Sequence, residues 1–125
     1  MLTLQDLINI KNKDNSEYKI QFGNFIINLY KNPEKYEKFL EKEPNWLDLD
    51  KKSISLIVSN MTYLCRKVNC KMKIYKWMLD KKFILKEPYF AMNAKDMLRI
   101  ILLQESPYDY RKNNIFVSEN VLSKI

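Results

Sequence analysis

The sequence contains no histidine, a single glycine (Gly23) and two cysteines, and these shortages exclude most common catalytic and metal sites. Histidine is the commonest general base and metal ligand near neutral pH, and phosphate-binding loops need several glycines where the backbone approaches the ligand. Cys65 and Cys70, without histidine or a second cysteine pair, form neither a zinc site nor a disulfide framework. We therefore expect two reduced thiols, with Cys65 buried, and no metal or cofactor.

Long apolar runs are also missing. Uninterrupted runs such as residues 100–103 extend over no more than four residues, whereas roughly 20 are needed to cross a bilayer. The N-terminal residues lack the basic, apolar and small-residue regions of a secretory signal. The sequence therefore predicts no association with a membrane and a cytoplasmic location.

Length and composition are those of one globular domain. The chain has 125 residues, of which 46% are hydrophobic and 30% charged, and this is enough to bury a core. We therefore expect a single domain over residues 1–125. The net charge is +7, but only three of the 22 cations, Arg66, Arg99 and Arg111, are arginine. Since lysine lacks the bidentate geometry of arginine, the charge by itself is weak evidence for nucleic-acid binding.

Apolar spacing predicts an all-α fold of about five to seven short helices. Helices are expected over residues 3–11, 16–30, 33–42, 53–68, 94–104 and 118–122. The helix over 53–68 has the clearest pattern, with apolar residues at steps of three and four, and we expect it at the centre of the fold. Gly23 inside the second helix indicates either a close helix contact or a break.

Two further expectations concern how apolar side chains face the core. In the helix over 94–104, capped by Asn93 and Asp96, the inward residues should be Met97, Leu98, Ile101 and Leu102. In the connection that follows the third helix, Trp46, Leu47 and Leu49 should lie against the core.

The stretch over residues 69–90 mixes cations with aromatic side chains and has no long period. Such interleaving can stack bases and hold phosphates, and it is also what a packed connection between helices looks like. If it binds nucleic acid, the candidate residues are Lys71, Lys73, Lys76, Lys81 and Lys82.

Candidate catalytic groups are few. Asp48 with Asp50, and Glu105 with Asp109, are the nearest carboxylate groupings, and neither has a recognisable nuclease spacing. Ser106 lacks a histidine partner for nucleophilic catalysis. We therefore expect a protein that binds rather than an enzyme.

The C-terminal half carries several short motifs. These are Trp77-x-x-Asp80, Leu85-x-Glu87-Pro88-Tyr89-Phe90, Glu105-Ser106-Pro107-x-x-Tyr110-Arg111 and Asn114-Ile115-Phe116-Val117. In these motifs the chain resembles the C-terminal domain of small bacterial antitoxin-like regulators found beside nucleotidyltransferase-like toxins. The resemblance covers roughly residues 22–125. Only about twenty residues precede it, too few for a three-helix DNA-reading module, so the resemblance does not imply DNA binding by a helix-turn-helix.

The resemblance implies a non-enzymatic protein that binds and neutralises a partner protein, a toxin of nucleotidyltransferase type. Its candidate partner-binding residues are Trp77, Glu87, Tyr89, Phe90 and Arg111. The alternative for such positions, and for Pro88, Pro107 and Phe116, is that they set the chain path and the core. Two other functions stay open: a nucleic-acid-binding accessory protein, and a phage-type inhibitor of a host defence nuclease. The sequence also leaves homodimer formation open.

Overall fold

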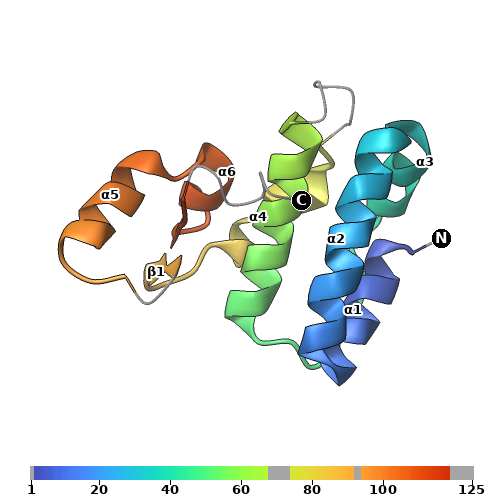
Figure 1. The fold of residues 1–125 in the computed structure, drawn as a ribbon, viewed down its shortest axis with the longest axis horizontal. Helices are drawn as coiled ribbons and strands as arrows, with labels where there is room; N and C mark the ends of the chain where they lie inside the picture. The colour runs from blue at the N-terminus through green and yellow to red at the C-terminus, as the bar shows by residue number, and fades with distance from the viewer. Residues whose placement is uncertain (1, 68–73, 92–93, 119–125) are drawn as a thin grey trace. The chain divides into compact units, whose positions relative to one another are not determined.

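The computed structural model describes residues 2–67, 74–91 and 94–118 (Figure 1). These residues form helices and one two-stranded parallel sheet, which confirms the all-α prediction. The α-helices are α1 (Leu4–Lys13), α2 (Asn15–Lys31), α3 (Pro33–Glu37), α4 (Lys51–Lys67), α5 (Met97–Glu105) and α6 (Tyr108–Arg111). The 3-10 helices are η1 (Lys38–Leu40), η2 (Lys76–Leu79) and η3 (Lys81–Phe83), and the strands are β1 (Tyr89–Phe90) and β2 (Ile115–Phe116).

The residues group into two compact units. Unit 1 contains described residues 2–49, 64–67 and 74–79, and unit 2 contains described residues 50–63, 80–91 and 94–118. Helix α4 therefore contributes residues to both units. The sequence predicts one domain for this length, and each unit is described here by itself.

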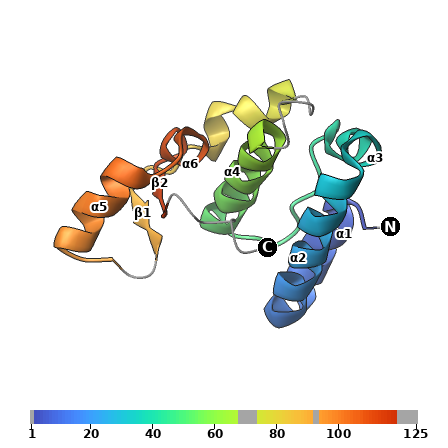
Figure 2. The same ribbon diagram turned by 45° about the horizontal axis from the view of Figure 1, so that its top comes forward.

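In unit 1, α1 and α2 lie side by side (Figures 1 and 2), and each begins with a side-chain cap. The Thr3 hydroxyl accepts a hydrogen bond from the Asp6 amide and the Asp6 carboxylate accepts one from the Thr3 amide, so the two residues form a capping box. Asp14 caps α2 by accepting hydrogen bonds from the amides of Ser16 and Glu17. These caps let α2 start directly after α1 ends, so the apolar faces of the two helices pack together.

Aromatic rings fill much of the core of unit 1. Phe25 of α2 and Tyr36 of α3 meet edge to face, with ring centroids 5.2 Å apart. The Trp77 indole nitrogen, in η2, donates a hydrogen bond to the Leu40 carbonyl oxygen at 2.8 Å, and the Trp77 ring lies 6.3 Å from that of Trp46. Phe25 and Tyr36 thus join α2 to α3, and Trp77 joins η2 to η1 and to the connection that contains Trp46.

In unit 2, the N-terminal part of α4 buries small polar side chains. The Asn113 amide nitrogen donates to the Ser59 hydroxyl at 2.9 Å, and the Tyr110 hydroxyl donates to the Asn60 side-chain oxygen. We call Ser59, Asn60, Tyr110 and Asn113 the buried polar network. The Ser55 hydroxyl likewise donates to a carbonyl oxygen of η3. These bonds tie α4 to α6 and η3 in a site where unpaired polar groups would be costly.

The sheet of unit 2 joins two distant segments of the chain (Figure 2). Strands β1 and β2 run parallel, with Tyr89 opposite Ile115 and Phe90 opposite Phe116. The rings of Phe90 and Phe116 stack with centroids 5.0 Å apart. The Ser106 hydroxyl accepts a hydrogen bond at 2.9 Å from the amide of the residue after β2, which fixes that strand beside the end of α5.

Several predicted helices are confirmed with small changes. The expected long amphipathic helix is α4, and it is buried more widely than one apolar stripe because its small polar side chains find partners in unit 2. The third helix is shorter than expected, since α3 passes into the 3-10 helix η1. Helix α2 continues through Gly23, which excludes the predicted break. The end of the 53–68 helix beyond Lys67 and the expected helix over 118–122 after Ser118 lie outside the described residues.

Two expectations about core-facing side chains are wrong. Leu102 of α5 is buried as expected, but Met97, Leu98 and Ile101 are exposed. Helical spacing reports a pattern along one helix, whereas burial requires a second element over that pattern. Leu47 is also exposed, at 50%, and has a φ of 57°. In that left-handed conformation its backbone turns the chain rather than following the core.

Candidate functional site

Unit 2 contains a hollow of about 290 Å³ whose lining combines cations with aromatic rings. The lining residues are Lys52, Pro88, Tyr89, Phe90, Ala94, Lys95 and Arg99. They come from the first turn of α4, from β1 and the residue before it, and from the start of α5 and the segment that leads into it. We call this feature the basic hollow.

The aromatic rings of the basic hollow position its cations. The Lys52 ammonium lies 4.6 Å from the centre of the Tyr89 ring, and the Arg99 guanidinium lies 4.7 Å from the centre of the Phe90 ring. Arg99 also donates a hydrogen bond from Nε to the Ala94 carbonyl oxygen at 2.8 Å. A cation over a ring face is held by the ring quadrupole, so two of the three cations are restrained without a carboxylate in the lining.

The charge of the basic hollow is uniform, because its lining contains three cations and no acidic side chain. Asp50, two residues before Lys52, does not line the basic hollow, and its carboxylate accepts a hydrogen bond from Ser53. The pKa of its carboxyl group is lowered chiefly by a hydrogen bond from the Ser53 side chain, and more weakly by the charge of Lys52. Like charges gathered in one concave site raise the local concentration of anions.

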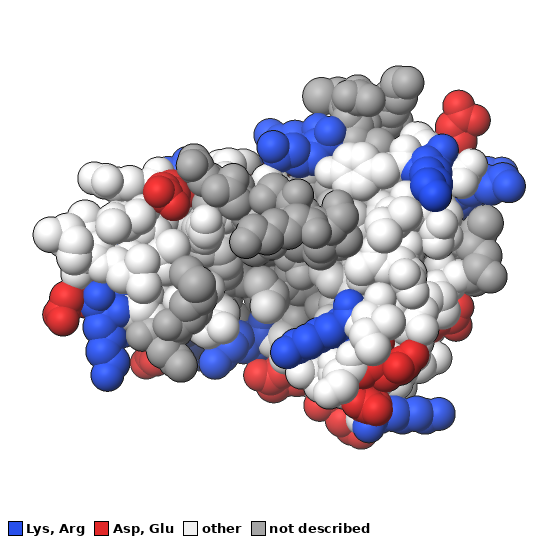
Figure 3. Space-filling model, in the orientation of Figure 1, with Lys and Arg blue, Asp and Glu red and all other residues white. Residues whose placement is uncertain are grey.

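The second feature of unit 2 is an apolar surface on α5. Its exposed side chains are Met97, Leu98, Ile100, Ile101 and Leu103, and we call them the apolar face of α5. Met97 is 67% exposed and Ile100 50% exposed. In Figure 3 the surface over α5 is largely uncharged, with charged side chains along its lower edge. Contiguous exposed apolar side chains of this kind mark interaction surfaces.

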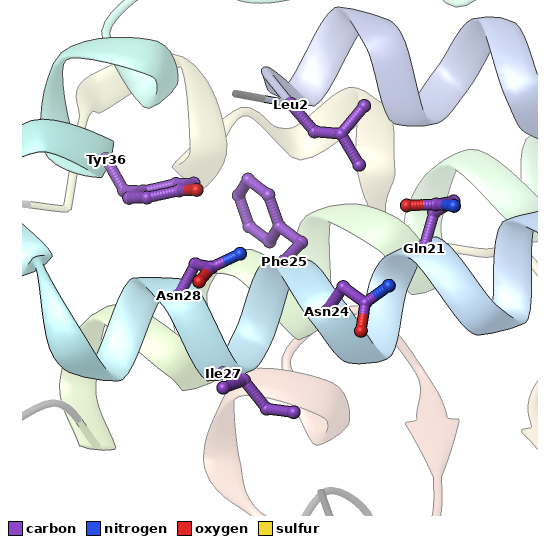
Figure 4. A pocket seen from close by; sticks show the side chains of 7 residues that line it. All are labelled: Leu2, Gln21, Asn24, Phe25, Ile27, Asn28 and Tyr36. Atoms are coloured by element: carbon purple, nitrogen blue, oxygen red, sulfur yellow. The ribbon is translucent and has the colours of Figure 1, made fainter.

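Unit 1 contains a separate hollow of about 330 Å³ beside α2 (Figure 4). Its lining residues are Leu2, Gln21, Asn24, Phe25, Ile27, Asn28 and Tyr36. Figure 4 shows Gln21, Asn24 and Asn28 spread along α2, with Phe25 of the same helix between them and Tyr36 of α3 near Phe25. No charged side chain lines it, so it offers hydrogen bonds but neither a nucleophile nor an acid and base pair.

The structure brings together two of the five predicted partner-binding residues. Tyr89 and Phe90 both line the basic hollow. Glu87 and Arg111 are exposed in the same unit but are not among its lining residues. Trp77 belongs to unit 1, is half-buried and donates a hydrogen bond from its indole nitrogen to a backbone carbonyl oxygen.

The sequence prediction missed the three cations of the basic hollow. Lys52 lies in the first turn of one helix, and Lys95 precedes another helix. Arg99 could have been singled out from the sequence as a candidate binding residue, because it is one of only three arginines in the chain. Nothing in the sequence, however, indicated that β1 would lie beside these residues.

The described lysines among those predicted to bind nucleic acid belong to both units. Lys76 is exposed in unit 1, whereas Lys81 and Lys82 are exposed in unit 2. The Lys82 ammonium lies 5.2 Å from the centre of the Phe83 ring. Lys71 and Lys73 lie outside the described residues.

Ser106, one of the candidate catalytic residues, is buried and hydrogen-bonded to the backbone. The Ser106 hydroxyl donates to the carbonyl oxygens of Leu102 and Val117. Cys65 is a buried free thiol, as predicted, and Cys70 lies outside the described residues. Over residues 2–67, 74–91 and 94–118, no cluster of three or more Cys, Asp or Glu side chains is placed to hold a metal ion.

Comparison with known proteins identified no relative. No protein-family model, no curated protein and no solved structure matched the chain. In the described part of the chain, none of the helices combines the length and the apolar character needed to cross a bilayer.

Proposed function

We propose that this protein is a non-enzymatic, antitoxin-like regulator that binds and neutralises a partner protein, a toxin of nucleotidyltransferase type, through the apolar face of α5. The observation that carries the proposal is the exposure of five apolar side chains on one nine-residue helix. The sequence motifs described above supply the type of partner. Covering a toxin's active site needs an interface and no chemistry from the inhibitor.

The exposed apolar side chains of α5 are stabilised when another element covers them. Only Leu102 of α5 is buried. At about 1.5 Å per residue, a helix of nine residues is about 13 Å long. This is less than half of a bilayer core of about 30 Å, so a groove in a protein suits α5 better than a membrane does.

The charges of the chain indicate which groove. The net charge is +7, and Lys95 and Arg99 lie at the N-terminal end of the apolar face. Interfaces combine an apolar centre with a polar rim, and opposite charges at the rim speed association. We therefore expect an apolar groove with an acidic rim on the partner.

The test is rescue from toxicity. The full chain is co-expressed with the protein encoded beside its own gene, and growth and complex formation are followed for the wild type, Ile100→Asp and Ile20→Asp. Ile20 is the matched control, because it is an equally apolar side chain, 60% exposed, on α2 of unit 1. A charge at the centre of an apolar interface should weaken binding by at least about tenfold.

The proposal predicts growth rescue and a stoichiometric complex for the wild type and for Ile20→Asp, with both lost for Ile100→Asp. Light scattering on the isolated variants separates a second copy of the chain from a different partner. If Ile100→Asp rescues growth as well as the wild type, or if the only effect of Ile100→Asp is to dissolve a homodimer, the proposal is wrong. A captured defence nuclease in place of a toxin would favour the inhibitor alternative.

A further inference from the structure

We propose that the basic hollow of unit 2 is a binding site for a phosphate monoester, such as the phosphate of a nucleotide or the phosphorylated end of a nucleic acid. The inference goes beyond the protein interface above and does not depend on it. It rests on the residues that meet at the hollow, which come from three separated parts of the sequence.

The first argument is charge. Lys52, Lys95 and Arg99 line the hollow and none of its other lining residues is acidic. Holding three positive charges in one concavity of about 290 Å³ is unfavourable until an anion enters. A phosphate monoester carries up to two negative charges at neutral pH and offers three strong acceptor oxygens. A carboxylate would compensate less of this charge.

The second argument is the fixed position of Arg99. Its guanidinium lies over the Phe90 ring, and its Nε donates to the Ala94 carbonyl oxygen at 2.8 Å. A guanidinium that is already restrained loses less side-chain entropy when it binds an anion. Its planar fork of donors matches phosphate oxygens, and the two lysines add point charges.

The third argument decides which part of the ligand is recognised. One face of the Phe90 ring stacks on Phe116 at 5.0 Å, and Arg99 lies over Phe90 at 4.7 Å. Lys52 lies over the Tyr89 ring at 4.6 Å. The rings therefore orient cations and do not offer open stacking platforms for bases. Recognition falls on the phosphate, and a hollow at the small end of the usual range of ligand sites suits such a group.

The experiment is a titration of the full, isotope-labelled chain followed by amide chemical shifts. The probes are inorganic phosphate, AMP, adenosine, and one short oligonucleotide with either a 5′-phosphate or a 5′-hydroxyl. We expect phosphate and AMP to shift the amide signals around Ala94, Lys95 and Arg99, and adenosine to shift none of them. Tighter binding of the 5′-phosphorylated oligonucleotide than of AMP would identify a nucleic-acid end as the source, and equal binding would identify a small phosphate ester.

Variants separate this site from the general charge of the protein. Lys95→Glu should weaken AMP binding by about tenfold or more, while Lys81→Glu, an equal charge change at an exposed position of unit 2, should change it less than about twofold. Arg99→Gln should behave like Lys95→Glu. Because Lys95 is exposed and outside any helix, Lys95→Glu should keep the thermal unfolding of the wild type.

Three results would each overturn the inference. The first is the absence of binding by phosphate and AMP at millimolar concentration. The second is an equal loss of affinity in Lys95→Glu and Lys81→Glu. The third is equal affinity for the 5′-phosphate and 5′-hydroxyl oligonucleotides, because a phosphodiester backbone would then be sufficient.

Discussion

Removal of the Tyr110 hydroxyl would measure how strongly the buried polar network holds unit 2 together. This hydroxyl donates to the Asn60 side-chain oxygen, and Tyr110 has no exposed surface. Tyr110→Phe keeps the ring, whose centroid lies 5.5 Å from that of Tyr63, and withdraws the donor from a buried acceptor. A buried acceptor that loses its partner costs about 1–3 kcal/mol. We therefore expect Tyr110→Phe to lower the free energy of unfolding by about 2 kcal/mol and Tm by roughly 5–10 °C.

The reverse deletion completes a double-mutant cycle. Asn60→Leu keeps a side chain of similar size but leaves the Tyr110 hydroxyl without its acceptor, so its cost should be comparable. In the double variant both polar groups are replaced by apolar ones, which is far less costly than leaving one unpaired. The coupling energy between Tyr110 and Asn60 should therefore be about 1–2 kcal/mol.

Urea unfolding of the full chain, followed by far-ultraviolet circular dichroism, is the assay. Tyr108→Phe serves as the control, because it deletes the same hydroxyl from an exposed side chain of α6 and should change stability by less than about 0.5 kcal/mol. The reasoning is refuted if Tyr110→Phe costs no more than Tyr108→Phe, or if the two network substitutions are simply additive.

Two other predictions concern the start of α4 and the role of Trp77. Asp50→Ala should destabilise the protein by about 1 kcal/mol, and Asp48→Ala, at an exposed neighbouring position, should have little effect in the same urea experiment. The hydrogen bond from Ser53 lowers the folded-state pKa of Asp50. The contribution of Asp50 to the free energy of unfolding is therefore present above the unfolded pKa of about 4, and it is lost as pH falls through the folded-state pKa. If the stability difference between the wild type and Asp50→Ala does not shrink in acid, this reasoning is wrong. Trp77→Phe should lower the free energy of unfolding by about 1 kcal/mol, measured by thermal unfolding, because the Trp77 indole donates a hydrogen bond to the Leu40 carbonyl oxygen. The same substitution should leave the affinity for AMP unchanged. A weaker affinity for AMP would indicate that Trp77 takes part in binding.

Helices α1, α2 and α4 show how much of the fold local sequence patterns can predict. The sequence predicted helix starts near Thr3 and Ser16 and the apolar spacing of α4, because caps and apolar spacing involve residues within a few positions of one another. The continuity of α2 through Gly23 was not readable, since the cost of glycine in a helix is small beside the packing of Phe22 and Phe25 on either side of it.

The basic hollow, in contrast, could be predicted only in part from local sequence patterns. Tyr89 and Phe90 were identified from a motif, but the hollow depends on a parallel pairing of β1 with a strand more than twenty residues later. The strand pairing and the contacts of Lys52 and Arg99 with the two rings join residues from separate segments of the sequence. The spacing of residues within one segment therefore cannot predict them.

The sequence by itself determined the helical character of this protein and the places where most helices begin. Those properties follow from residue type and short-range geometry. Only the tertiary structure decided that α5 would bury Leu102 and expose the rest of its apolar side chains, and that three cations would share one hollow. Exposure and proximity depend on which elements cover which faces, and that is set by the packing of residues far apart in the chain.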